Sequence, residues 1–196
     1  MILVELTEVP DTVLPVARLK EHLRLGTGFS DDDVQDALLA GFLRAAIAAI
    51  EGRTGKVLVG RTYAMTVNAW RRAERQPFPV APVPSVISVT LIDAEGVAAT
   101  LPAGTWRLDA DAVRPCLVIP GFLPPIPTGG SARIIFEAGL GPDWAKVPSD
   151  LTQAVLMLAA HYHEFRHETA LSAGCMPFGV TALIDRYRPI RLSGGF

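Results

Sequence analysis

The spacing of apolar residues predicts helices near both ends of the chain. Apolar positions recur there at intervals of three and four residues, which is typical of an amphipathic helix. Proline and glycine mark several of the expected ends, because proline suits a first helical turn and glycine suits a helix stop. The expected helices lie between Pro15 and Gly26, from Asp31 to about Arg53, over LTQAVLMLAAHYHEFRHE after Pro148, and over 180–188.

The second of these helices carries two apolar stripes, where a lone surface helix normally carries one. One stripe consists of Val34, Leu38, Phe42, Ala45 and Ala49, and the other of Leu39, Leu43, Ala46, Ile47 and Ile50. Two interpretations remain open, a central core helix or a helix that packs both on its own domain and on a neighbouring copy. On the second interpretation, Leu39, Leu43 and Ile47 are the expected subunit interface.

The middle of the chain has the period-two alternation of β-strands. Strands are expected over 56–70, over 85–101 as a pair joined by a turn at Asp93–Gly96, and over 105–109, 116–120 and 132–139. The proline-rich stretches 76–84 and 120–130 are expected at sheet edges or outside the sheet, because proline cannot donate to a ladder. The predicted fold class is α+β. About four helices form the core, and a β-rich insertion at 56–139 lies between the second and third long helices of one domain, 1–196.

Composition narrows the classes of function. The chain has 196 residues, 49% hydrophobic residues, a net charge of −2 and a mean hydropathy of +0.31. The slight acidity disfavours general DNA affinity. The absence of a ~20-residue apolar run disfavours a membrane span. The two unpaired cysteines and the lack of a signal-peptide pattern suggest a cytosolic product. The high hydropathy indicates either a large core or apolar surface that other subunits cover.

The segment HEFRH (163–167) has the H-E-x-x-H spelling of a zinc hydrolase. In that hypothesis His163 and His167 bind zinc and Glu164 is the general base. The extended motif fails, because Ala170 and Ala173 occupy the positions of its glycine and third histidine. We therefore favour a structural helix and keep the zinc hydrolase as the alternative.

The sequence offers no other pattern of catalysis. It contains no nucleophile elbow, phosphate loop, dinucleotide fingerprint or C-x-x-C pair. The basic stretch WRRAER (70–75) is interpreted as a solvated hairpin tip rather than a nucleic-acid reader. No catalytic residue, metal ligand or cofactor is expected.

The order of several short patterns resembles a known family. They include Pro15, Leu19 and Leu23, the acidic cap Asp31–Asp33, and Glu51 with Thr54-Gly55 after the alanine-rich helix. Further along come Pro84-Ser85-Val86, Trp106, Phe136, Gly139, Val147-Pro148, Leu151, His161-Tyr162, Glu164, Arg166, Pro177, Gly179, Tyr187 and Arg188. Together they resemble the head–tail connector proteins, also called adaptor or head-completion proteins, of tailed bacteriophages and gene transfer agent particles. HYHEFR departs from the usual pattern of that family, an aromatic pair followed by Glu-x-x-Arg or Glu-x-Arg.

The resemblance implies a structural protein of the virion or gene transfer agent particle, assembled in the bacterial cytoplasm. It implies a homo-oligomeric ring, expected to be a dodecamer, at the head–tail junction. The portal protein and the next tail-proximal connector, or stopper, are the expected partners, and double-stranded DNA passes through without sequence-specific binding. The extended tail 189–196 is expected to reach the portal. The residues expected to bind there are Arg188, Ile190, Arg191, Leu192 and Phe196.

Overall fold

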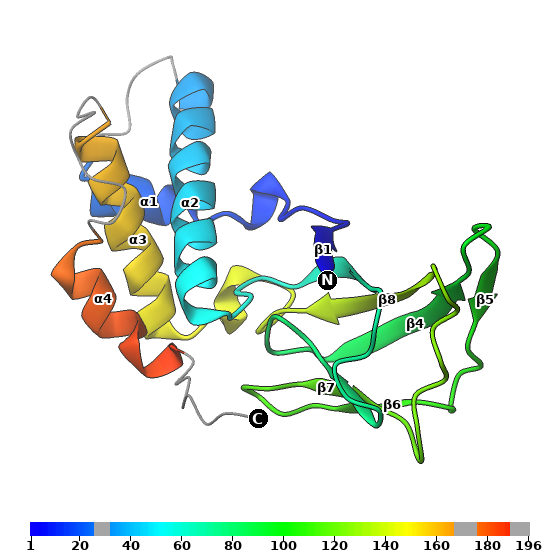
Figure 1. Ribbon diagram of the computed structural model, residues 1–196. Helices are drawn as coiled ribbons and strands as arrows, with labels where there is room; N and C mark the ends of the chain where they lie inside the picture. Colours follow the sequence, from blue (N-terminus) through cyan, green and yellow to red (C-terminus); the bar gives the residue numbers. More distant parts are fainter. Residues whose placement is uncertain (26–31, 167–175, 189–196) are drawn as a thin grey trace. The chain divides into compact units, whose positions relative to one another are not determined.

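The chain folds into two compact units (Figure 1). This computed structural model describes residues 1–25, 32–166 and 176–188, and for residues 32–34 it describes the backbone alone. The β unit consists of residues 1–9 and 59–142, and the helical unit consists of residues 10–58 and the chain from Asp143 onward.

Four α-helices build the described part of the helical unit: α1 (Val16–His22), α2 (Asp32–Thr54), α3 (Ser149–Glu164) and α4 (Phe178–Ile184). Short 3₁₀ helices occupy Asp11–Val13, Trp144–Lys146 and Asp185–Tyr187. Helix α3 packs against each of the other three helices. It does so because its buried residues cover more than one face: Leu151, Val155 and Leu158 form one stripe, and Leu156 and Ala160 lie on another.

Helix α2 ends where the sequence predicted a stop. The Thr54 hydroxyl donates to the Ile50 carbonyl at 2.8 Å, and Gly55 adopts a φ of 65° that glycine tolerates without strain. The Glu51 carboxylate then accepts a hydrogen bond from the Leu58 backbone N–H at 2.8 Å. These bonds fix the chain in the turn between α2 and the start of the β unit.

The β unit contains two antiparallel sheets. The larger sheet has the order β1 (Ile2–Glu5), β2 (Arg61–Val67), β8 (Ser131–Ala138), β4 (Ser85–Ile92) and β5 (Ala98–Thr100). The smaller sheet has the order β3 (Arg75–Pro77), β7 (Cys116–Val118) and β6 (Arg107–Asp109). Pro77 lies on an edge strand, the place in a sheet that tolerates a residue without an N–H group.

The core of the β unit follows from strand alternation. Tyr63 and Met65 on β2 face the same side as their partners on β8, Phe136 and Ile134, and all four are buried. The Phe136 ring lies 5.8 Å from the Tyr63 ring and 4.6 Å from the ring of Phe78. This aromatic cluster ties the segment that follows β3 to the centre of the larger sheet.

Gly139, just after β8, packs directly on the chain segment that leads into β2. A side-chain carbon at Gly139 would lie 2.5 Å from the Gly60 Cα atom, and the φ of Gly139 is 147°. The Gly60 N–H donates to the Gly141 carbonyl at 2.8 Å, and Val59 forms a parallel bridge with Gly141. Only glycine fits this crossing of two backbones.

The structure confirms the predicted α+β fold class and the placement of the β-rich region between the second and third long helices. The predicted turn at Asp93–Gly96 joins β4 and β5. The compact β unit covers 59–142 rather than 56–139, and it also takes in residues 1–9. Strands β1 and β3 were not predicted.

Candidate interaction surfaces

The HEFRH motif lies at the end of helix α3. The helix ends at Glu164, an exposed residue, and Phe165 leaves the helical conformation with φ −99° and ψ 20°. Arg166 Nη1 donates to the His163 carbonyl at 2.8 Å, which satisfies one of the carbonyls that a helix end leaves open. His167 lies outside the described residues. Because α3 ends before position 167, it does not provide the continuous helix that the zinc motif requires.

His163 has a packing role. Its half-buried ring meets the Phe42 ring edge-on, with centroids 5.8 Å apart and an interplanar angle of 88°. Burial and then the neighbouring Arg166 charge lower the pKa of His163, against the opposite effect of Glu164. Within the described ranges, no three His, Cys, Asp or Glu side chains are grouped so that they could hold a metal ion. These residues therefore offer no support for the zinc-hydrolase alternative.

The stripe of α2 that was expected at a subunit interface lies inside the helical unit. Leu39 and Leu43 have no exposed surface, and Ile47 is 4% exposed. These side chains are buried in the core of the single chain. For these three residues, the interpretation of α2 as a central core helix therefore describes the structure. Leu38, on the other stripe, is 48% exposed. It is the leucine of α2 that is available to a neighbour.

The last described residues are fixed to the start of α3. The Tyr187 hydroxyl donates to both carboxylate oxygens of Asp150, at 2.9 and 3.0 Å. Arg186 pairs with the same carboxylate at 2.8 Å and also donates to the Tyr187 hydroxyl. Exposed Arg188 pairs with Asp185 at 3.3 Å. Residues Ile190, Arg191, Leu192 and Phe196, predicted to bind the portal, lie outside the described residues.

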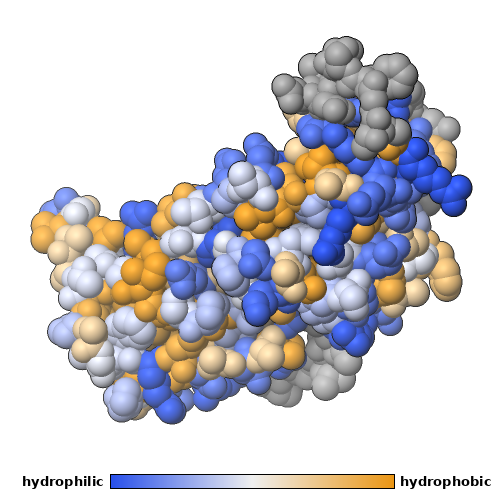
Figure 2. Space-filling view, turned by 180° about the vertical axis from the view of Figure 1, so that it is seen from behind, coloured by the Kyte–Doolittle hydropathy of each residue, from blue (hydrophilic) through white to orange (hydrophobic). Residues whose placement is uncertain are grey.

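Large apolar side chains reach the surface of both units. Figure 2 shows one face, on which apolar residues form patches between polar ones. The most exposed are Phe178 in α4, at 88%, and Phe122 in the segment after β7, at 73%. Across the described ranges, no helix combines the length and apolar character needed to cross a bilayer. Exposed patches of this kind are typical of protein–protein contact surfaces.

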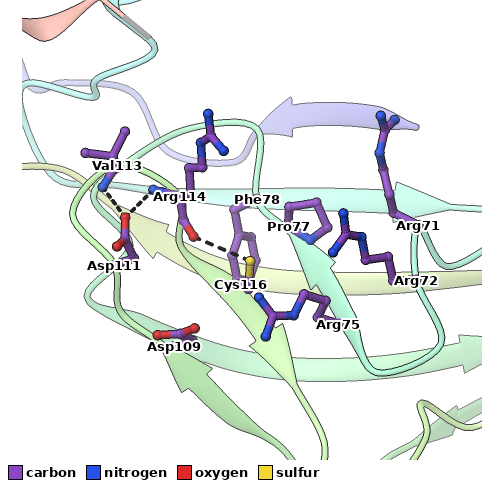
Figure 3. Close-up of a pocket in the computed structure, with 10 residues that line it drawn as sticks. All are labelled: Arg71, Arg72, Arg75, Pro77, Phe78, Asp109, Asp111, Val113, Arg114 and Cys116. Carbon is purple, nitrogen blue, oxygen red and sulfur yellow. Dashed lines mark hydrogen bonds between the residues drawn. The ribbon is translucent and has the colours of Figure 1, made fainter. Parts of the chain in front are cut away.

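The β unit also carries a pocket of about 390 Å³ beside the smaller sheet (Figure 3). Four arginines and two aspartates line it with apolar residues: Arg71, Arg72, Arg75, Arg114, Asp109, Asp111, Pro77, Phe78, Val113 and Cys116. Figure 3 shows the Arg75 guanidinium turned toward Cys116 and the Arg72 guanidinium turned toward Pro77. We call this site the arginine pocket.

Pairing of β3 and β6 with β7 creates the arginine pocket. Pro77 lies opposite Cys116 on one side of β7 and Asp109 lies opposite it on the other, so residues far apart in sequence share one face. Burial raises the pKa of the Cys116 thiol, although the Arg75 charge acts in the opposite direction. The thiol is therefore protonated at neutral pH. The arginines are the groups of this pocket that can bind a ligand, through their positive charge and N–H donors.

Sequence reasoning placed WRRAER in a solvated hairpin tip and missed this pocket. The stretch instead lies between β2 and β3, which belong to different sheets. Its arginines meet Asp109 and Arg114 only through strand pairing, so the local sequence carried no signal for the pocket.

The chain is closely similar to solved structures of gene transfer agent (GTA) particles. A chain in the neck of an empty GTA particle, computed with C6 symmetry, is 51% identical with a TM-score of 0.90. A chain in the virion of a native GTA particle is 50% identical with a TM-score of 0.87, and one in the neck of a native GTA particle, computed with C12 symmetry, is 47% identical with a TM-score of 0.85. Each comparison covers 100% of this chain and 99% of the other.

Neither a protein-family model nor a curated protein matches the sequence. The structural comparisons nevertheless cover both chains from end to end at about half identity, and they confirm the resemblance seen in the sequence. The chain therefore belongs to the family of head–tail connector proteins of gene transfer agent particles.

Proposed function

We propose that this protein is a structural connector at the head–tail junction of a gene transfer agent particle. The observation that carries the proposal is the 51% identity, with a TM-score of 0.90, to a neck chain over the whole of both chains. The similar chains are components of particles, which supports a role in assembly rather than catalysis.

The connector acts as a ring of identical subunits. The similar neck chains come from assemblies with C6 and C12 symmetry, and twelve copies satisfy both. A closed ring has a heterologous interface, in which one surface of each subunit meets a different surface of the next. Exposed apolar residues on both units, including Leu38, Phe122 and Phe178, are suited to such contacts.

Within the neck, we assign the protein the adaptor position, between the portal protein and the stopper. Double-stranded DNA would pass through its channel without sequence-specific binding. The net charge of −2 supports this passive role, because a strongly basic channel would hold the phosphate backbone. The same arrangement gives the protein its part in head completion, since tail components would dock on the ring.

The tail 189–196 is proposed to bind the portal. The residues just before the tail are anchored, because Arg186 and Tyr187 both contact Asp150 at the start of α3. This anchor gives the tail a fixed starting point for binding the portal. Arg188 and Arg191 can pair with carboxylates, and Ile190, Leu192 and Phe196 can fill apolar pockets.

The first experiment deletes the gene in the producing bacterium and examines particles by electron microscopy. The expected result is filled heads and separate tails that do not join, with joining restored by the wild-type gene. Normal tailed particles in the deletion strain would overturn the proposal.

The second experiment tests the tail. One variant lacks residues 189–196, and a matched control replaces them by eight Gly and Ser residues so that only the side chains are lost. Both variants are expected to keep the wild-type circular dichroism spectrum and to lose attachment to portal-bearing heads. Attachment by either variant at the wild-type level would remove the tail from the portal interface.

A further inference from the structure

We propose that the arginine pocket binds the acidic tip of the β4–β5 hairpin of a second copy of this chain. The inference rests on the proposed ring and specifies one contact in its subunit interface. The occupant is the turn Asp93–Val97, and Glu95 is the side chain that enters among the arginines.

The pocket has unused positive charge. Among the described residues, no carboxylate lies within ion-pair distance of the Arg71, Arg72 or Arg75 guanidinium groups. All three side chains are exposed, on a protein whose overall charge is −2. Arginine presents a planar fork of donors that matches a carboxylate or a phosphate, so the pocket is suited to an anionic group.

The other lining residues favour a protein carboxylate over DNA. DNA binding normally needs an extended basic surface that neutralises many phosphates, whereas this pocket of about 390 Å³ has room for one anionic side chain. Asp111 Oδ1 accepts backbone hydrogen bonds from Val113 at 2.8 Å and Arg114 at 2.6 Å, which hold the wall of the pocket in place. Apolar Pro77 and 59% exposed Val113 offer surface to an aliphatic side chain beside the acid.

The β4–β5 turn carries the complementary groups. Asp93 Oδ1 accepts hydrogen bonds from the backbone N–H groups of Glu95 at 3.1 Å and Val97 at 2.7 Å, so its carboxylate stabilises the turn itself. Gly96 completes the turn with a φ of 85°. The rigid tip therefore presents the exposed Glu95 carboxylate next to Val97, which is 65% exposed.

The two features lie at different ends of the β unit, as a head-to-tail contact requires. In Figure 1 the β4–β5 hairpin projects at one end of the β unit, and the turn between β6 and β7, which contributes to the pocket, lies at the other. A surface and its complement that are separated in this way cannot satisfy each other within one chain. They can do so between successive copies around a ring.

A charge-swap experiment tests the contact in particles. Strains producing Arg75→Glu, Glu95→Arg or the double variant are compared with wild type for the number of connector copies per purified particle. Arg107→Glu is the matched control, because Arg107 is an exposed arginine of the same sheet outside the pocket. Each single variant is expected to lower the copy number by about tenfold, because like charges are then brought together, and the double variant to restore it. The control is expected to match wild type.

Several results would overturn the inference. They are normal incorporation of either single variant, or a double variant no better than the worse single variant. Arg75→Glu particles with the full number of connectors but impaired DNA delivery would identify DNA as the ligand instead. Absence of the wild-type protein from particles would contradict the proposed function itself, which is a different outcome.

A second measurement covers the case in which a charge reversal lowers thermal stability. Arg72→Cys and Glu95→Cys are combined in a background with Cys116 and Cys175 changed to Ser, and particles are oxidised. The expected result is a ladder of covalent multimers that neither single variant forms. Absence of the ladder would overturn the contact.

Discussion

Alanine at Gly139 is expected to destabilise the β unit strongly, because two separate costs fall on one residue. The φ of 147° is a conformation that side chains rarely adopt, and such strain costs about 1–3 kcal/mol. The new Cβ atom would also lie 2.5 Å from the Gly60 Cα and 2.6 Å from the Gly60 N. These are backbone atoms and cannot rotate away, so overpacking adds about 1–3 kcal/mol. The expected loss is therefore about 2–6 kcal/mol.

Two other glycines separate these costs. Gly104 has a φ of 93° with open space around it, so Gly104→Ala should lose only about 1–2 kcal/mol. Gly41 occupies an exposed position within helix α2, where an added Cβ atom would meet nothing within 4 Å, so Gly41→Ala should stabilise the protein by about 0.5–1 kcal/mol. The same Gly→Ala change is thus predicted to increase the stability at position 41, to decrease it modestly at position 104 and to decrease it strongly at position 139.

Urea unfolding is the assay, followed by circular dichroism and by tryptophan fluorescence. Trp70 and Trp106 belong to the β unit and report on its unfolding. If Gly139→Ala were no less stable than Gly104→Ala, the backbone overlap would not be a real constraint, and the explanation for this glycine would fail.

Four further predictions concern the helical unit. The pKa of His163 is lowered in the folded protein, so as pH falls the unfolded chain binds a proton at this histidine before the folded chain does. The free energy of unfolding should therefore decrease as pH drops below about 6.5, and His163→Gln should reduce this decrease when the urea midpoint is measured against pH. Tyr187→Phe removes the hydrogen bonds to Asp150 and should cost about 1 kcal/mol in the same assay, while Tyr187→Ala should cost more. Phe178→Ser should change stability by less than about 0.5 kcal/mol because the ring is 88% exposed, yet should reduce the fraction of tailed particles counted by electron microscopy. Elemental analysis should find well under one zinc per chain, and stoichiometric zinc that His163→Ala abolishes would revive the hydrolase hypothesis.

Long periodic segments could be predicted from the sequence because their own pattern determines them. Helix α2 ends at Thr54 since Gly55 is suited to a left-handed conformation, and the β4–β5 turn has aspartate and glycine where the turn needs them. Strands β1 and β3 were missed because both are short edge strands whose existence depends on partners far away in sequence. Residues 2–5 show no alternation, and β3 contains a proline.

The sites were harder to predict than the elements. Periodicity showed that α2 has two apolar stripes but not which one the fold buries, and so Leu39 and Leu43, which are buried within the chain, were expected at a subunit interface. The arginine pocket joins 71–78 to 109–116 through strand pairing, which neither stretch indicates alone. The zinc spelling of HEFRH depends on a continuous helix, and α3 ends within the motif.

The position of β1 has a consequence for protein synthesis. Its first paired residue, Ile2, lies opposite Thr66 on β2, and β2 in turn is stabilised by β8, which is made later still. Strand β1 is translated before both β2 and β8, so it must wait for residues 61–138 before its sheet can close. An affinity tag fused ahead of Met1 would lie directly beside this edge, so we expect fusions there to slow the maturation of newly made protein.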